Sequence, residues 1–148
     1  MAEPSYAPLD VRRVIGERDL AAAFAVRWRV FVEEQHVPPA VERDEWDASA
    51  AHVIVESNGT VVATGRLVAH DGTGHIGRIA VLPEWRRRGI AGRVIVALEA
   101  EAARRGLREI SLHSQFYIQG LYDQHGYRVS GPVFLEAGID HVPMTKRL

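Results

Sequence analysis

The sequence predicts an α/β fold in which a mixed β-sheet carries helices on both faces. Asn58-Gly59 separates two apolar runs, over 53–56 and 60–69, and Asn-Gly is the strongest two-residue signal for a β-hairpin. The chain then alternates between a strand, an amphipathic helix and a strand, over 76–82, 89–105 and 109–113. A hairpin followed by a strand–helix–strand unit predicts a mixed sheet with helices on both sides.

The first third of the chain adds a strand, a long helix and a loop. Residues 9–15 are expected to form a strand. A helix is predicted over 18–34, because four large apolar residues recur on one helical face, namely Leu20, Phe24, Trp28 and Phe31. Residues 36–47 are polar and contain Pro38-Pro39, which predicts a loop with room for one helical turn.

The later elements follow from similar signals. Residues 71–74 are expected to form a turn, and Pro83 ends the strand before the second helix because proline cannot donate to a sheet. Glu101 and Arg105 form an i,i+4 pair on the exposed side of that helix, which Gly106 ends. Its buried stripe is Ile90, Val94, Ala97 and Leu98. A short helix and two late strands complete the chain, over 116–124, 127–129 and 142–146.

Composition narrows the class of protein. A chain of 148 residues, 47% hydrophobic and 25% charged, predicts a single globular domain over 1–148. The net charge of −1 gives no general attraction to nucleic acid or to a membrane. The absence of cysteine excludes disulfides, thiolate nucleophiles and cysteine-based zinc sites. With no long apolar run and no signal pattern, we expect a cytoplasmic monomer or homodimer with flexible residues 1–8.

A basic, glycine-containing loop stands between the strand over 76–82 and the second helix. It reads Arg86-Arg87-Arg88-Gly89-Ile90-Ala91-Gly92. Small residues let backbone N–H groups approach a ligand, and a helix N-terminus supplies unpaired donors and partial positive charge. Arginine adds forked donors for phosphate oxygens. The loop therefore predicts a pyrophosphate site, although a tight turn with solvated arginines is an equal alternative.

Two better-known nucleotide motifs do not account for this loop. A Walker A loop requires Gly-Lys-Ser or Gly-Lys-Thr after an earlier glycine, and the chain has no such run. The pattern Gly-x-Gly-x-x-Gly occurs at 72–77, but it precedes a strand where a dinucleotide site needs a strand-to-helix turn.

The loop matches the coenzyme A signature of the GNAT acyltransferase superfamily, Gln/Arg-x-x-Gly-x-Gly/Ala, at Arg86, Gly89 and Ala91. Further motifs resemble the ElaA-like subgroup between about Arg27 and Met144: Arg27 to Gln35, Glu42 to Asp47, His52, Ser114-Gln115, Leu121 to Tyr127 and Phe134 to Met144. The resemblance implies a mixed, mostly antiparallel GNAT-type sheet and transfer of acetyl from acetyl-CoA to a primary amine.

The resemblance also implies site residues. The coenzyme would contact the splayed strand Ile79-Ala80-Val81, whose N–H groups would stabilise the oxyanion, and the loop Arg86 to Gly92 (Arg86, Arg87, Arg88, Gly89, Ile90, Ala91 and Gly92). Tyr122 corresponds to the tyrosine that lies near the coenzyme sulfur and is the expected acid. Read alone, Tyr122 is more simply a packed core aromatic.

The residues themselves leave the general base open among Glu33, Glu34, His36, Glu42, Asp44 and His113. Glu34 is preferred because it lies in the matching motif, seven residues after Arg27 and therefore on the same helix face. The alternative is that it is a solvated carboxylate at a helix end.

Acceptor-binding candidates are Arg66, Arg78, His52, Gln115 and His141. Arg66 and Arg78 lie inside apolar strands, so they need carboxylate partners, which Asp44 and Asp47 can supply in a purely structural ion network. The seven histidines show no metal-binding spacing, and we expect no metal.

Three functions remain at this stage. The first is an acyl-CoA-dependent N-acyltransferase that acts by direct attack in a ternary complex on a small-molecule or peptide amine. The second is an acyl-homoserine-lactone synthase-like enzyme, which the short chain disfavours. The third is a catalytically silent coenzyme A-binding sensor.

Overall fold

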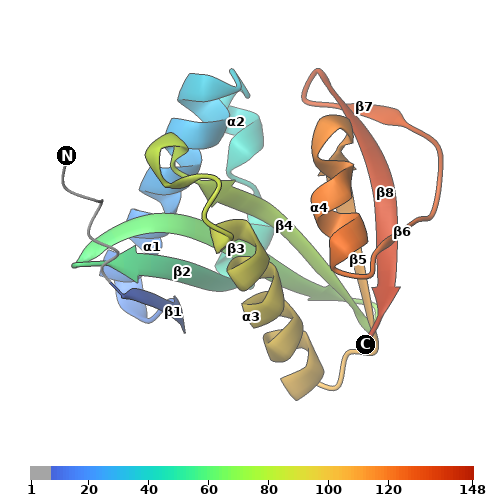
Figure 1. Cartoon of the computed structure of the whole chain (residues 1–148), viewed down its shortest axis with the longest axis horizontal. Coiled ribbons are helices and arrows are strands. Elements are labelled where there is room, and N and C mark those ends of the chain that lie inside the picture. Colours follow the sequence, from blue (N-terminus) through green and yellow to red (C-terminus); the bar gives the residue numbers. More distant parts are fainter. Residues whose placement is uncertain (1–7) are drawn as a thin grey trace.

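The computed structural model describes residues 8–148, in which eight strands form one sheet with the order β1-β2-β3-β4-β5-β8-β6, and β7 pairs with β8 (Figure 1). The strands are β1 (Leu9–Arg13), β2 (Ala51–Ser57), β3 (Thr60–His70), β4 (Thr73–Val81), β5 (Glu109–Gln115), β6 (Arg128–Val129), β7 (Phe134–Glu136) and β8 (Ile139–Arg147). Apart from Pro8, the segment predicted to be flexible lies outside the described residues.

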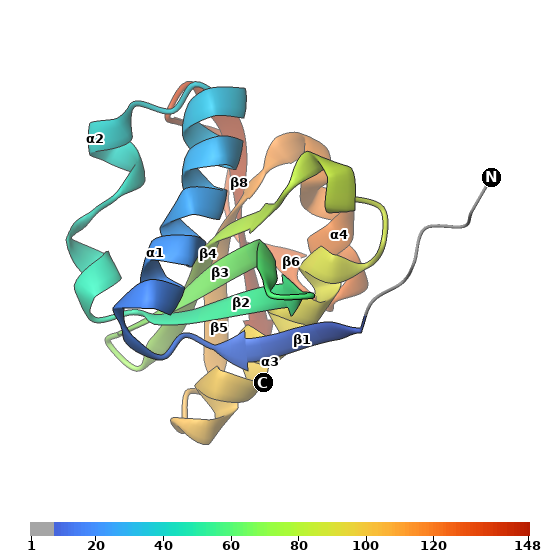
Figure 2. The same ribbon diagram turned by 90° about the vertical axis from the view of Figure 1, so that its left-hand side faces the viewer.

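Every pair of neighbouring strands is antiparallel except β4 and β5, which are parallel. The principal helices are α1 (Gly16–Arg27), α3 (Ile90–Arg104) and α4 (Gln119–Gln124). Figure 2 shows α1 on one side of the sheet and α3 and α4 on the other. The predicted mixed, mostly antiparallel sheet with helices on both faces is therefore confirmed. Among the described residues, no helix is long and apolar enough to cross a bilayer.

Helix α3 packs closely on the centre of the sheet. Its residues Val94 and Leu98 are fully buried, as the predicted stripe requires. The close approach depends on Gly65 in β3, because a Cβ there would lie 2.6 Å from Val94 Cγ1 and 3.0 Å from Leu98 Cδ1. The prediction that Glu101 is exposed is wrong, since this residue is buried and contacts Arg105 and two other arginines.

The predicted helix over 18–34 changes its geometry halfway. After α1, residues Trp28–Glu34 form a π-helix, η1. Its wider turn is closed by a hydrogen bond of 3.1 Å from the Gln35 N–H to the Val30 carbonyl, five residues earlier. The change rotates the later side chains relative to α1, and Arg27 and Glu34 accordingly have different surroundings: Arg27 contacts Asp47, whereas Glu34 contacts Arg86.

The predicted loop over 36–47 contains two short helices, α2 (Pro39–Glu42) and the 3₁₀-helix η2 (Glu45–Ala48). Asp44 caps η2, because its carboxylate accepts the Trp46 N–H and its own N–H donates to Asp47, each at 3.1 Å. Two further 3₁₀-helices, η3 (Pro83–Trp85) and η4 (Phe116–Ile118), precede α3 and α4. The predicted turn over 71–74 is shorter than expected, since β4 already begins at Thr73.

Candidate functional site

A cleft opens where β4 and β5 separate. The two strands pair only at Gly74–Ile110 and His75–Ser111, after which β4 continues to Val81 and β5 to Gln115. Figure 1 shows the strands diverging from this junction. The cleft has a volume of about 1090 Å³. Because β4 has no strand partner on this edge beyond His75 within residues 8–148, its backbone polar groups there are free to face a ligand.

A β-bulge in β4 contributes to this separation. Arg66 of β3 pairs with Gly77 and Thr64 pairs with Ala80, so β4 has one residue more than β3 in this interval. The extra residue is accommodated at Arg78, whose φ of 51° is unusual for a residue other than glycine. A bulge bends its strand and increases the local twist. The predicted coenzyme-binding residues Ile79, Ala80 and Val81 follow it directly and line the cleft.

The basic loop forms one end of the cleft. Arg87 and Gly89 both have left-handed backbones, with φ of 64° and 74°, and Gly89 is the N-cap of α3. The first N–H groups of an α-helix have no acceptor within the helix, and the N-terminus carries partial positive charge. Gly89, Ile90, Ala91 and Gly92 all line the cleft, so these donors border it. Gly92 has a second role, since a Cβ there would lie 3.0 Å from His125 Nε2.

The three arginines of the loop have different surroundings. Arg86 forms a bidentate ion pair with Glu34, with N–O distances of 2.7 and 2.8 Å, and both residues line the cleft. Hydrogen bonding from Arg86 lowers the pKa of the Glu34 carboxyl. The guanidinium carbon of Arg88 lies over the Trp85 ring, 4.8 Å from the ring centroid, and Arg88 does not line the cleft. Arg87 lines the cleft and has no ion-pair partner among the described residues.

Tyr122 of α4 lies deeper in the same cleft, on the side of the sheet covered by α3 and α4. It is 7% exposed, and burial raises the pKa of its hydroxyl to about 12. Within residues 8–148 the hydroxyl has no hydrogen-bond partner, so it is available to a ligand. Tyr127 packs edge-on against its ring at 6.0 Å and donates to Glu99 at 2.9 Å, so Tyr127 is a packing residue.

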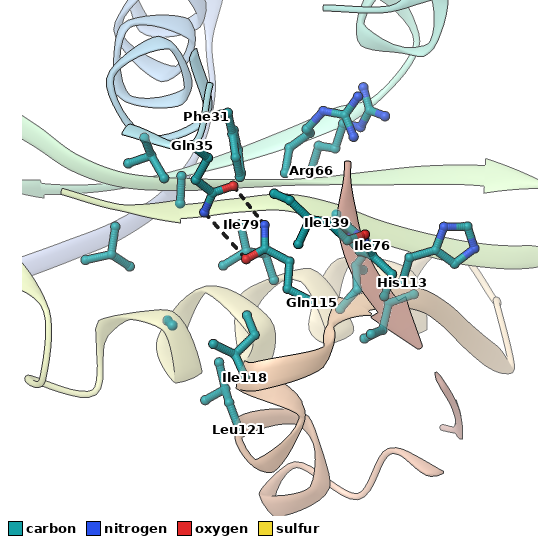
Figure 3. A pocket seen from close by; sticks show the side chains of 18 of the residues that line it. Phe31, Gln35, Arg66, Ile76, Ile79, His113, Gln115, Ile118, Leu121 and Ile139 are labelled. Carbon is teal, nitrogen blue, oxygen red and sulfur yellow. Dashed lines mark hydrogen bonds between the residues drawn. The ribbon is translucent and has the colours of Figure 1, made fainter. Parts of the chain in front are cut away.

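Two glutamines connect the walls of the cleft. Gln115 at the end of β5 donates to the Gln35 side-chain oxygen at 2.8 Å, and Gln35 donates in return at 3.5 Å, as the dashed lines in Figure 3 show. Tyr117 also donates its hydroxyl to Gln115. The sequence predicted Gln115 as an acceptor-site residue but assigned no role to Gln35, which directly follows η1 and lies 80 residues away in the sequence.

A cluster of histidines with one carboxylate lines the opposite side of the cleft from Tyr122. Glu136 of β7 lies 3.1 Å from His113 Nδ1 and 3.6 Å from His141 Nε2. All three residues line the cleft. The sequence named His113 as one possible base and His141 as an acceptor-site residue. It assigned no role to Glu136, although this residue lies in the motif over 134–144.

The predicted ion network between Arg66 and the acidic loop is confirmed. Arg66 contacts both oxygens of Asp44, at 2.7 and 2.8 Å, and one oxygen of Asp47 at 2.8 Å. Burial tends to raise the pKa of the Asp47 carboxyl, but hydrogen bonds from Arg27 and Arg66 outweigh it and hold this pKa well below its usual range. Arg78 joins through Asp44 at 3.3 Å.

Arg27 is the buried centre of this network, which the sequence did not indicate. It is 1% exposed and contacts Glu42 at 2.5 and 2.9 Å and Asp47 at 2.7 and 3.0 Å. Three arginines and three carboxylates thus hold the loop that carries α2 and η2 against the sheet.

His52 lies apart from the other predicted acceptor-site residues. It is buried behind the acidic loop, with Nε2 3.0 Å from the Asp47 carbonyl and the ring edge-on to Phe24. It borders a smaller, separate pocket, whereas Arg66, Arg78, Gln115 and His141 line the main cleft. Among the described residues, no group of three or more His, Cys, Asp or Glu side chains is arranged to hold a metal ion.

Comparisons with known proteins agree with this architecture. YjcF of Bacillus subtilis, an uncharacterized N-acetyltransferase, is 41% identical over 131 residues, which are 88% of this chain and 94% of YjcF. An acyl-CoA N-acyltransferase from Pseudomonas aeruginosa superposes with a TM-score of 0.85 and 27% identity over 94% of this chain and 99% of its own.

Escherichia coli ElaA has the same fold, with a TM-score of 0.84, 23% identity and coverage of 94% of this chain and 99% of ElaA. The family model described as an acetyltransferase (GNAT) domain matches residues 6–148. The chain therefore belongs to the GNAT acetyltransferase family.

Proposed function

We propose that this protein is an acetyl-CoA-dependent N-acetyltransferase. The observation that carries the proposal is the cleft between β4 and β5, which leads from a free strand edge to the N-terminus of α3. Extended chains pair with free strand edges, and phosphate groups bind at helix N-termini. An extended thioester with a pyrophosphate at its far end matches both features.

Each part of the cleft would hold a different part of acetyl-CoA. The N–H groups of Ile79 and Val81 would bind the pantetheine arm and the thioester carbonyl, because the Leu82 N–H donates to Val62 of β3 and the Ala80 N–H, two residues earlier, points to the same side. The first turn of α3 and the free cation of Arg87 would bind the pyrophosphate. Arg86 is already paired with Glu34, so it would neutralise less of the phosphate charge than Arg87.

Transfer would be direct, from thioester to amine, because the chain has no cysteine to carry the acyl group. Tyr122 is the proposed acid, since its hydroxyl is free and its raised pKa keeps it protonated at physiological pH. Glu34 was the preferred base, but its lowered pKa makes it a weak proton acceptor. We therefore assign Glu34 the role of holding Arg86 against the cleft.

The acceptor is proposed to enter from the α1 side of the sheet, where Arg78, Gln115 and His141 line the cleft. GNAT acetyltransferases act on small-molecule or peptide amines, and either class remains a candidate. The cytoplasmic location and the monomeric or dimeric state stay predictions.

The test is release of free thiol from acetyl-CoA by the purified full chain in the presence of mixed primary amines, with mass spectrometry of the acetylated products. Thiol release that depends on amine supports the proposal. Tight binding of acetyl-CoA without turnover of any amine would instead indicate a coenzyme A sensor.

A further inference from the structure

His113 occupies a defined position on the acceptor side of the cleft. Along β5, Ile110, Leu112 and Ser114 are buried, while the alternate residues point to the opposite face. His113 and Gln115 share that face, and Gln115 contacts Gln35 there, directly after η1. Tyr122 lies on the other face, so the two residues border the cleft from opposite sides.

The hydrogen bond to Glu136 determines the tautomer of His113. Glu136 Oε1 lies 3.1 Å from Nδ1, and an ionised carboxylate can only accept a hydrogen bond. Nδ1 of His113 must therefore carry the proton, which leaves Nε2 of the neutral ring with a free lone pair. No other hydrogen bond is made by this ring within residues 8–148. Hydrogen bonding to Glu136 raises the pKa of His113 above its ordinary value.

Glu136 also lies beside His141. Nε2 of His141 is 3.6 Å from the second carboxylate oxygen, which is too long for a hydrogen bond, and Nδ1 of His141 donates to the Ile139 carbonyl at 2.7 Å. Phe134 lies between the two rings, edge-on to His113 at 4.9 Å and stacked on His141 at 5.9 Å. The contacts place a carboxylate behind an oriented imidazole, the arrangement that activates histidine as a base in hydrolases.

The charged groups that face His113 come from three strands: Glu136 of β7, His141 of β8 and His75 of β4. Arg78 lies near enough to lower the pKa of Glu136. Glu136 is the direct partner, so it dominates the titration of His113.

We propose that Nε2 of His113 is the general base that deprotonates the acceptor ammonium group, with Glu136 as its positioning residue. This inference rests on the proposed acetyltransferase function and adds the base that Glu34 does not supply.

The proposed reaction begins with a proton transfer to His113 and ends with protonation of the leaving sulfur. The ammonium nitrogen gives one proton to Nε2 of His113, which later releases it to solvent. The amine lone pair forms the C–N bond at the thioester carbonyl carbon, the C–S bond breaks, and its electron pair stays on sulfur. Tyr122 gives its proton to that sulfur and recovers one from the nitrogen. The products are an amide, a free thiol and one proton.

The test compares two variants at this site with one control, using the amine that wild type acetylates fastest. His113→Gln should lower kcat/KM by roughly 10²–10⁴ at neutral pH, the usual contribution of a general base, without changing the Kd for coenzyme A. Glu109→Gln is the control, because Glu109 lies on the same strand as His113, is exposed and does not line the cleft. Its rate should equal that of wild type.

The pH profile separates a base from a structural histidine. The activity of wild type should fall as the pH decreases through the raised pKa of His113, which gives its pH profile an acidic limb. The profile of His113→Gln should lack this limb. Glu136→Gln keeps an acceptor for Nδ1 but removes the charge, so the limb should move to lower pH. Imidazole ¹⁵N NMR of wild type should show the Nδ1–H tautomer of His113.

Three results would each overturn the role of His113 as the base and leave the acetyltransferase function intact. These are an unchanged kcat/KM in His113→Gln, an acidic limb of the pH profile that does not move in Glu136→Gln, and an Nε2–H tautomer of His113 in the NMR spectrum. A wild type that binds acetyl-CoA but acetylates no amine overturns both.

Discussion

The replacement Asp47→Asn should destabilise the protein strongly, because Asp47 joins two buried arginines. Its carboxylate accepts from Arg27 at 2.7 and 3.0 Å and from Arg66 at 2.8 Å. Asparagine has nearly the same shape, but it removes the negative charge and turns an NH₂ group toward a guanidinium. Breaking a buried ion pair costs about 3–5 kcal/mol. In the variant, Arg27 still has its ion pair with Glu42, and Arg66 still has its ion pair with Asp44. We therefore expect a loss of stability at the lower end of this range, about 3 kcal/mol.

The free energy of unfolding would be measured by urea denaturation at pH 7, with the melting temperature as a second readout. A loss of about 3 kcal/mol corresponds to a decrease of roughly 6–12 °C in a domain of this size. The matched control is Glu84→Gln, which makes the same chemical change in the bidentate pair with Arg29, where both side chains are nearly half exposed. Solvent screens that pair, so its loss should be a small fraction of the loss at Asp47.

The dependence on pH follows from the lowered pKa of Asp47. A carboxyl group whose pKa is lower in the folded than in the unfolded state stabilises the protein above its unfolded pKa, near 3.9. This stabilisation is lost as the pH falls toward the folded pKa. The difference between wild type and Asp47→Asn should therefore be full at pH 7 and shrink by about 1.4 kcal/mol per unit below about pH 4. Equal losses in Asp47→Asn and Glu84→Gln, or a difference that is constant with pH, would refute this account of the network.

Three further predictions concern the cleft and the sheet. Gly89→Glu should weaken coenzyme A binding by roughly 30–1000-fold in calorimetry, since a carboxylate 4–8 Å from a phosphate repels it by about 2–4 kcal/mol. Gly106→Glu is the control with nearly the same φ, +75° against +74°, at the far end of α3, and should bind normally. Gly65→Ala should lower the unfolding free energy by about 1–3 kcal/mol, because the added methyl group overpacks the contact with α3. Gly77→Ala is the control and should change the unfolding free energy much less, because the space around its Cβ is open. Equal effects of the two substitutions would contradict the packing argument. Tyr122→Phe should reduce kcat by about 10²-fold, less at high pH, with unchanged coenzyme A affinity, and full kcat would make Tyr122 a packing residue only.

The local elements could be predicted from sequence because their signals are local. Asn58-Gly59 has left-handed φ values of 49° and 78°, as a hairpin turn of this type requires. Helix α3 carries its apolar residues at a spacing of 3.6 and ends at Arg104, two residues before the left-handed Gly106. The glycine loop before it was visible as a motif, and the family followed from several motifs in order along the chain.

Most pairings between distant side chains could not be read from the sequence. Arg86 meets Glu34 across 52 residues, and His113 meets Glu136 across 23, so no periodicity connects them. Arg27 carried a family signal, but its burial depends on a loop that folds back from residues 42 to 47. The sequence suggested carboxylate partners for Arg66, because an arginine inside an apolar strand needs one.

The sequence by itself thus determined the order and type of the main elements, the glycine-containing loop before α3 and the family, since these depend on neighbouring residues. The tertiary structure decided the π-helical turn after Arg27, the bulge at Arg78 and the separation of β4 from β5. Each is a departure from regular geometry that is stable only when packing around it compensates. For the same reason the tertiary structure decided which carboxylates bind arginine and which one orients a histidine.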